Sequence, residues 1–227
     1  MSVRVSASLV PAGALPSSTA AVVIDVLRAT TTLSVALANG AARVLPATSP
    51  EAAAERRRRR PRALLCGERG GLKLPGFDLG NSPFEYDAAA VRGRDLIFAS
   101  TNGSLALIAA RSARRRVLAA FVNASAVLET LAGDDDVTFV CAGALGRPCL
   151  EDLGCAGWLA AGLARRGARL DAAARALAAL APRDAAAVRT LVQGASHARD
   201  LRALGPAYAA DVEFCARLDT LSAAFEV

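Results

Sequence analysis

Residues 20–32 read Ala-Ala-Val-Val-Ile-Asp-Val-Leu-Arg-Ala-Thr-Thr-Thr, and they indicate the fold class of the chain. Apart from its acid, the run 20–26 is apolar and rich in β-branched side chains, which is typical of a buried strand. A helix is predicted over residues 30–39, and Gly40 is placed to end it in a left-handed conformation. The order of strand, polar turn and helix is the repeating unit of an α/β protein.

The rest of the chain repeats this alternation. Further strands are predicted over residues 43–46, 63–66, 95–99, 116–120 and 137–141. Further helices are predicted over residues 50–60, 102–112, 124–131 and 150–166. Residues 67–81 are glycine-rich and without periodicity, and the chain from residue 171 to about 217 is almost entirely helical in pattern. We therefore expect one α/β domain over residues 1–227, with a mostly parallel or mixed sheet flanked by helices and a helical C-terminal portion.

Composition narrows the class of protein. No apolar stretch reaches the roughly 18 residues of a membrane span, and the N-terminus has no apolar core of a signal peptide. Five cysteines without a CxxC pair and a single histidine predict neither a zinc site nor a disulfide framework. We therefore expect a cytoplasmic protein with no membrane partner. The net charge of +6 favours a polyanionic ligand, but aromatic residues are only 4%, so we expect a small anion rather than nucleic acid.

Polar residues fall at the ends of four predicted strands. In an open parallel sheet, ligands bind beyond the carboxyl ends of the strands. The four polar runs are Asp25 to Thr32, Glu68 with Arg69, Ser100-Thr101-Asn102-Gly103, and Cys141 with Gly143. Their convergence predicts one binding site at this edge of the sheet.

The residue types indicate a phosphate ligand and a divalent metal ion. Arg28 and Arg69 carry guanidinium forks that match phosphate or sulfonate oxygens. Thr30 and Thr31 open a predicted helix, whose first N–H groups favour an anion. Asp25 and Glu68 are hard oxygen ligands of the kind that Mg²⁺ takes.

A second chemistry stays open at Cys141. Together with Arg147 it has the Cys-x5-Arg spacing of cysteine-dependent phosphatases, in which a thiolate attacks phosphate and no metal is needed. A buried cysteine that closes a strand is the competing interpretation, and we favour it.

Several of these runs closely resemble one known family. They are residues 25–32, the run Gly-Glu-Arg-Gly-Gly-Leu-Lys-Leu-Pro-Gly-Phe-Asp-Leu-Gly-Asn-Ser-Pro at residues 67–83, Thr-Asn-Gly at residues 101–103, and Glu-Asp at residues 151–152. The chain resembles the 2-phosphosulfolactate phosphatase family over nearly its whole length, including a weaker match in the tail around Ser196 and Asp211.

The resemblance implies Mg²⁺-dependent hydrolysis of 2-phospho-3-sulfolactate to 3-sulfolactate and phosphate, a step toward coenzyme M. Asp25 and Glu68 are expected to hold the metal and, with Asp152, to take part in catalysis. The expected substrate-binding residues are Arg28, Thr30, Thr31, Arg69, Lys73, Asn81, Ser100, Thr101, Asn102, Gly103, Cys141 and Gly143.

Other interpretations remain at this stage. The substrate is open between the sulfonate and another small phosphorylated hydroxy acid, and a non-catalytic anion- or nucleic-acid-binding protein is a further alternative. The nucleophile is open between a metal-activated water and the Asp25 carboxylate. His197 is predicted to be a surface residue of the helical tail, and the apolar helix faces predict a homodimer.

Overall fold

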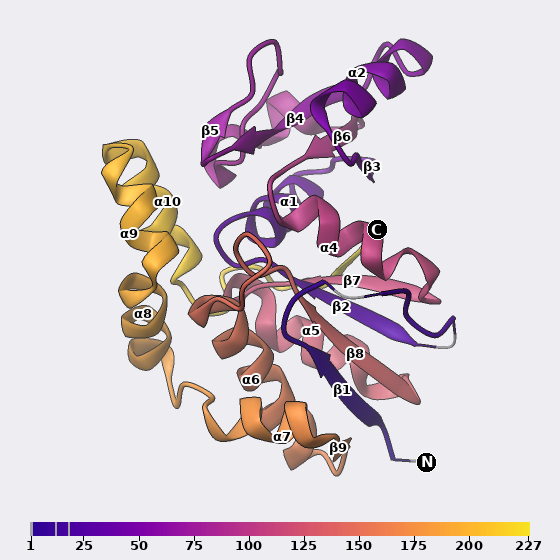
Figure 1. Ribbon diagram of the computed structural model, residues 1–227, viewed down its shortest axis with the longest axis vertical. Helices are drawn as coiled ribbons and strands as arrows, with labels where there is room; N and C mark the ends of the chain where they lie inside the picture. Colours follow the sequence, from indigo (N-terminus) through magenta and orange to yellow (C-terminus); the bar gives the residue numbers. More distant parts are fainter. Residues whose placement is uncertain (1, 12, 18) are drawn as a thin grey trace.

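The computed structural model describes residues 2–11, 13–17 and 19–227, which form two β-sheets with helices packed around them (Figure 1). The larger sheet has six strands in the order β10, β7, β2, β8, β1, β9. All neighbouring pairs in it are parallel except β10 with β7. Its strands are β1 (Arg4–Ser8), β2 (Ala20–Ile24), β7 (Arg115–Ala119), β8 (Asp136–Cys141), β9 (Arg169–Leu170) and β10 (Phe225–Glu226).

The smaller sheet has four strands in the order β3, β6, β4, β5, and β5 is antiparallel to β4. Its strands are β3 (Arg43–Pro46), β4 (Leu64–Arg69), β5 (Leu72–Lys73) and β6 (Asp95–Ala99). The mixed α/β class predicted from the sequence is confirmed, but its strands are divided between two sheets. The stretch 67–81 also differs from expectation, because β4 continues to Arg69 and turns through Gly70 and Gly71 into β5.

The helices follow the predicted positions closely. They are α1 (Ala29–Ala38), α2 (Pro50–Arg59), α3 (Ala88–Val91), α4 (Gly103–Ala109), α5 (Ala124–Thr130), α6 (Leu150–Arg165), α7 (Ala172–Ala179), α8 (Ala185–Gly194), α9 (Ser196–Ala203) and α10 (Pro206–Cys215). Ser82 and Pro83 open only a single 3₁₀ turn, Pro83–Glu85. Across the described part of the chain, no helix combines the length and apolar character that crossing a membrane requires.

Strand β2 is apolar throughout because both of its faces are buried. Successive side chains of a strand point to opposite faces. Val22 and Ile24 enter a core that includes Leu159 of α6. Ala21 and Val23 enter a second core, which contains side chains of α1 and of the smaller sheet. Residues 20–24 therefore separate two hydrophobic cores. The next residue, Asp25, lies between the two sheets.

The helical C-terminal portion predicted from the sequence is confirmed as α7 to α10. Helices α8 to α10 run along one side of the molecule, and α7 lies beside α6 and β9 (Figure 1). Val188, Val192, Leu201 and Val212 anchor α8, α9 and α10 in the core beneath the larger sheet. Because this packing fixes α9, its exposed face is available to close a cavity at the ends of the strands.

Candidate active site

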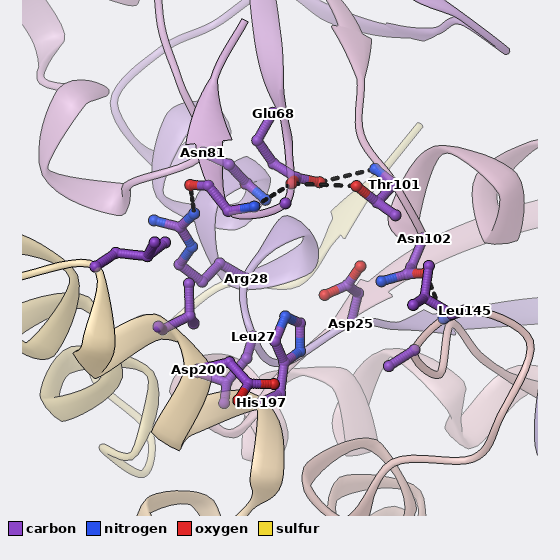
Figure 2. A pocket seen from close by; sticks show the side chains of 15 residues that line it. Asp25, Leu27, Arg28, Glu68, Asn81, Thr101, Asn102, Leu145, His197 and Asp200 are labelled. Carbon is purple, nitrogen blue, oxygen red and sulfur yellow. Dashed lines mark hydrogen bonds between the residues drawn. The ribbon is translucent and has the colours of Figure 1, made fainter.

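A cavity of about 220 Å³ lies where strand ends of the two sheets meet α9. Figure 2 shows side chains from these elements pointing toward a common space. Lining residues come from the turns after β2 and β8, from β4 and the β4–β5 hairpin, from the turn after β6, and from α9. They are Asp25, Leu27, Arg28, Glu68, Gly70, Gly71, Asn81, Thr101, Asn102, Ala144, Leu145, His197, Asp200, Leu201 and Leu204.

Asp25 follows β2 directly and is only 6% exposed. The Ala29 N–H donates to its Oδ1 at 3.1 Å, whereas its Oδ2 receives no hydrogen bond from any described residue. Burial raises the pKa of Asp25 to about 6; Glu68 and Glu151 add to the rise, while His197 and the Ala29 N–H oppose it. The Asp25 carboxylate is therefore oriented through its Oδ1, and its Oδ2 is free to bind a ligand.

Gly103 makes room for this carboxylate. A Cβ atom at Gly103 would lie 2.6 Å from Asp25 Oδ2 and closer still to the Cβ of Ala29. Only glycine allows α4 to begin so near the β2–α1 turn. Gly103 was predicted to bind substrate, but it does not line the cavity, and in the structure it makes room for the Asp25 carboxylate.

Glu68 lies on β4 and is oriented by three donors. The Thr101 N–H donates to its Oε1 at 2.7 Å, and the Gly71 N–H and the Thr101 hydroxyl donate to its Oε2 at 2.8 and 3.2 Å. These bonds tie the β4–β5 hairpin to the turn after β6, as the dashed lines of Figure 2 show. A carboxylate has about four acceptor positions, so Glu68 keeps one for a further ligand.

The two carboxylates that line the cavity suit a magnesium ion. Mg²⁺ is usually held by one or two protein carboxylates, with water and substrate phosphate completing its shell. Asp25 offers a free oxygen and Glu68 a spare acceptor position, which is the donor chemistry that this ion needs. The described residues contain no group of three or more acids, histidines or cysteines arranged to hold a metal by themselves. A site here would thus be completed by water and substrate.

Arg28 lines the cavity but is committed to protein partners. Its guanidinium donates to Asp211 Oδ2 at 2.5 Å and to the Gly71 carbonyl at 2.6 Å, and it lies over the Tyr208 ring at 5.3 Å from the centroid. Both ends of the ion pair are buried, with side-chain exposures of 2% and 1%. Arg28 therefore joins the β4–β5 hairpin to α10, and Asp211 offsets its charge.

Asn81 has a polar atom without a partner. Its side-chain Oδ1 is buried and has no hydrogen-bond partner among the described residues. The residue lines this cavity, called the main cavity because it contains Asp25 and Glu68, and also an adjoining cavity of about 410 Å³ that contains Lys73. Unpaired buried polar atoms are rare and costly in proteins. Asn81 and Lys73 are thus placed to meet a polar group of a ligand that extends from one cavity into the other.

His197 departs from expectation. It was predicted to be a surface residue, yet it lines the cavity from α9, with its side chain 26% exposed. Its Nδ1 is 3.3 Å from Oε1 of Glu151, which is 1% exposed. This is an ion-pair distance rather than a hydrogen bond, because neither carboxylate oxygen of Glu151 has a hydrogen-bond partner among the described residues.

Asp152 is buried and does not line the cavity, and its carboxylate supports the neighbouring turns through hydrogen bonds. Its Oδ1 accepts from the Val26 N–H at 2.8 Å and its Oδ2 from the Gly143 N–H at 3.0 Å. Burial raises its pKa well above the usual value, and the nearby Asp25 and Glu151 raise it further. Asp152 and Gly143 therefore fix the β2–α1 and β8–α6 turns against each other and shape the cavity from behind.

Cys141 is enclosed in the protein. The thiol is fully buried, and burial raises its pKa well above the usual value. Arg147, the other half of the Cys-x5-Arg spacing, is exposed, and neither residue lines the cavity. The expected substrate contact at Cys141 therefore needs correction, since a buried protonated thiol beside Asp152 is neither a nucleophile nor a ligand contact.

Besides Cys141, Gly103, Gly143 and Lys73, four more residues predicted to bind substrate lie outside the main cavity. The hydroxyls of Thr30 and Thr31 are buried and donate to the carbonyls of Asp25 and Val26. Ser100 bonds the start of α4, with its Oγ accepting from the Ser104 N–H at 3.0 Å. The Arg69 guanidinium donates to the Glu68 carbonyl at 3.0 Å. These hydrogen bonds support the turns around the site.

The turn after β6 does reach the cavity. Thr101 and Asn102 both line it. The Oδ1 of Asn102 accepts from the Leu145 N–H at 3.0 Å, which ties this turn to the loop after β8. The structure thus brings together Asp25, Arg28, Glu68, Asn81, Thr101 and Asn102, with His197 and Asp200 added from α9.

Comparison with known proteins places the whole chain in one group. A family model described as 2-phosphosulpholactate phosphatase matches residues 6–227. A Deinococcus radiodurans protein, named as a probable 2-phosphosulfolactate phosphatase, is 41% identical over 221 residues, which are 96% of this chain and 90% of the relative.

Two further relatives carry the same name. The protein of Thermotoga petrophila is 41% identical over 199 residues, covering 88% of this chain and 85% of the relative. The protein of Symbiobacterium thermophilum is 42% identical over 207 residues, covering 89% of this chain and 88% of the relative. The similarity therefore spans both sheets and the helical tail.

Proposed function

Because the chain belongs to the 2-phosphosulfolactate phosphatase family, we propose that it hydrolyses 2-phospho-3-sulfolactate to 3-sulfolactate and phosphate with the aid of Mg²⁺. The enzyme class, a phosphoric monoester hydrolase, follows from the family. The observation that carries the finer proposal is the pair of oriented carboxylates, Asp25 and Glu68, that line one cavity with an acceptor position to spare on each.

Asp25 and Glu68 would hold the metal ion, which when bound offsets the repulsion between these acids and an anionic substrate and stabilises charge on the transferring phosphoryl group. The three hydrogen bonds to Glu68 keep its carboxylate in one orientation before substrate arrives. Such preorganisation matters because phosphoryl transfer depends mostly on positioning and electrostatics.

The raised pKa of Asp25 suits two roles. With a pKa of about 6, its carboxylate is mostly ionised at neutral pH, and it is more basic than an ordinary aspartate. It is therefore equipped either to accept a proton from an attacking water or to attack phosphorus itself. In either role the oxygen available for reaction is Oδ2, which receives no hydrogen bond from any described residue.

The substrate carries a carboxylate and a sulfonate beside its phosphate. Asn81 and Lys73 line the adjoining cavity, which shares Arg28, Gly71 and Asn81 with the main one. We propose that a distal anionic group extends toward the Lys73 ammonium, while the phosphate lies near Asp25 and Glu68. A substrate without the sulfonate would lose this contact.

Phosphate release tests the proposal. The protein is assayed on 2-phospho-3-sulfolactate and on related phosphorylated hydroxy acids, with Mg²⁺ and again with EDTA. We expect metal-dependent turnover that prefers the sulfonate and that falls at least 10³-fold in Asp25→Asn, since a group acting at the reacting centre is worth several kcal/mol. Asp135→Asn, an exposed change at the opposite end of the larger sheet, is the matched control. Full metal-dependent turnover by Asp25→Asn would refute the proposed site.

Location and assembly remain proposals as well. We propose a cytoplasmic homodimer that contributes to coenzyme M synthesis. Gel filtration with light scattering measures the assembly, and a monomer at assay concentration would exclude the dimer.

A further inference from the structure

Glu151 occupies a position that protein stability alone does not explain. It lies in the first turn of α6, is 1% exposed, and has two carboxylate oxygens with no hydrogen-bond partner among the described residues. A buried carboxylate without hydrogen bonds is costly, and such groups persist where they perform a function. The imidazole of His197 is the one basic group that the described residues place within ion-pair distance of it.

The imidazole is oriented by this contact. Its Nδ1 faces Glu151 at 3.3 Å, so Nε2, the nitrogen across the ring, is left for the cavity that His197 lines. Figure 2 shows the ring reaching from α9 into the space that Asp25 also faces. A histidine held at one nitrogen by a carboxylate, with the other nitrogen open to a substrate, is equipped for proton transfer.

The surroundings of His197 favour its protonated form. Glu151 and Asp152 approach from α6, Asp25 from the β2–α1 turn, and Asp200 lines the same cavity from α9. Burial by itself lowers the pKa of His197, but Glu151, Asp25 and Asp152 outweigh burial, and the pKa is raised. The acids around His197 thus stabilise its imidazolium, the form that can donate a proton.

We propose that His197 donates a proton to the leaving oxygen of the substrate and that Glu151 is the residue that positions its imidazole. This rests on the proposed phosphatase function. The bond between phosphorus and the ester oxygen breaks, its electron pair stays on that oxygen, and the Nε2 proton of His197 moves to it and gives the alcohol. The nucleophile forms the new bond to phosphorus, and the imidazole regains its proton from water.

The reaction needs such a donor. The leaving group of 2-phospho-3-sulfolactate is a secondary alkoxide beside a carboxylate, which is a poor leaving group unless it is protonated. A nitrophenolate, by contrast, leaves without a proton. A general acid therefore matters for the first ester and hardly for the second, whereas a residue with only a structural role would affect both equally.

Kinetics on two esters tests the catalytic role. We expect His197→Gln to lower kcat on 2-phospho-3-sulfolactate by roughly 10²-fold or more, the usual contribution of a general acid, and to lower kcat on 4-nitrophenyl phosphate by less than about tenfold. We expect Glu151→Gln to show the same pattern with a smaller loss. Arg199→Gln, an exposed change two residues along α9, is the matched control and should leave both rates unchanged. Equal losses on both esters would overturn the proposal.

The histidine can also be observed without any turnover, because it is the only one in the chain. In untagged protein, a ¹H–¹⁵N NMR titration reports its pKa directly. We expect Glu151→Gln to lower that pKa, and an unchanged value would refute the pair whatever the substrate. If the pair is present but the wild type hydrolyses neither ester, both the proposed function and the catalytic role of His197 are rejected.

Discussion

Replacement of Gly103 by alanine tests how closely the site is built around Asp25. The new Cβ would lie 2.6 Å from Asp25 Oδ2, where ordinary contact begins at 3.4 Å, and it would also press on the methyl group of Ala29. The carboxylate and the β2–α1 turn would therefore have to move by roughly 0.8 Å, the difference between these two distances.

Two energies oppose each other in this variant. Overpacking a well-filled site costs about 1–3 kcal/mol. Alanine is the better helix former and returns up to about 1 kcal/mol, less at the first position of α4. We expect a net loss of about 1–2 kcal/mol, which lowers Tm by about 2–8 °C in a protein of this size. The catalytic loss should be larger, about 10²-fold, because a displacement near 1 Å at a reacting group costs that much.

Thermal unfolding and phosphate release are measured on the same preparations. Gly194→Ala, at the end of α8, is the matched control, because its new Cβ would meet no atom within 4 Å. It should keep full activity and equal or slightly greater stability. If Gly103→Ala retains wild-type kcat, the close approach of α4 to Asp25 is not what holds the carboxylate in place.

Three further outcomes are expected. Asp211→Asn should lower the free energy of unfolding by about 3–5 kcal/mol in urea, because it leaves the Arg28 guanidinium buried without its counter-charge, whereas the exposed change Glu213→Gln should have little effect. Cys141→Ala should keep kcat within about threefold, since general acid–base effects of 10² or more require a group at the reaction centre, and a large loss would reopen the cysteine mechanism. Because the pKa of Asp25 is raised from 3.8 to about 6, its contribution to stability is full below pH 4 and is lost as the pH rises through 6. In EDTA at pH 8, Asp25→Asn should therefore increase the free energy of unfolding by up to about 3 kcal/mol, and a decrease there would contradict the burial of this charge.

Strands with two buried faces are among the elements that could be predicted from the sequence. The stretches around β2 and β6 are continuous apolar runs, and the structure places them within a residue or two of expectation. Strand β1 was missed although it lies inside the larger sheet, because Arg4–Ser8 has one fully buried side chain and no apolar run. The division of the strands into two sheets was also beyond prediction, since buried runs do not reveal which neighbours they pair with.

A usable signal was present at one missed element. Gly70 and Gly71 both have positive φ, at 57° and 84°, and form a two-residue turn between Arg69 and Leu72. A Gly-Gly pair between two short segments is a recognised hairpin pattern, because such turns need positive φ. Interpreting residues 67–81 as loop overlooked this, and with it the reason why the Gly71 N–H meets Glu68.

The candidate site was predicted in part. A physical cause separates the residues that were placed correctly from those that were not. Asp25, Glu68, Thr101 and Asn102 follow apolar runs, so the strand-end rule predicts that they meet, although the structure brings them together from two sheets rather than at one edge. Thr30 was assigned to substrate because it opens a predicted helix whose first N–H groups favour an anion. A helical threonine can instead bond a carbonyl in the preceding turn, and here it does.

His197 and Asp200 belong to α9, and nothing local in an amphipathic helix tells which distant strand end it covers. Their place follows instead from packing, because Leu201 of the same helix is buried in the core beneath the larger sheet. Residues three and four apart share one face of a helix, so seating Leu201 brings His197 to the same side, at the rim of the cavity. His197 therefore comes close to Asp25 and Glu68 only when the C-terminal helices have packed against the larger sheet. A variant that loosens α9, such as Leu201→Ala, should accordingly lose activity before it loses the fold of either sheet.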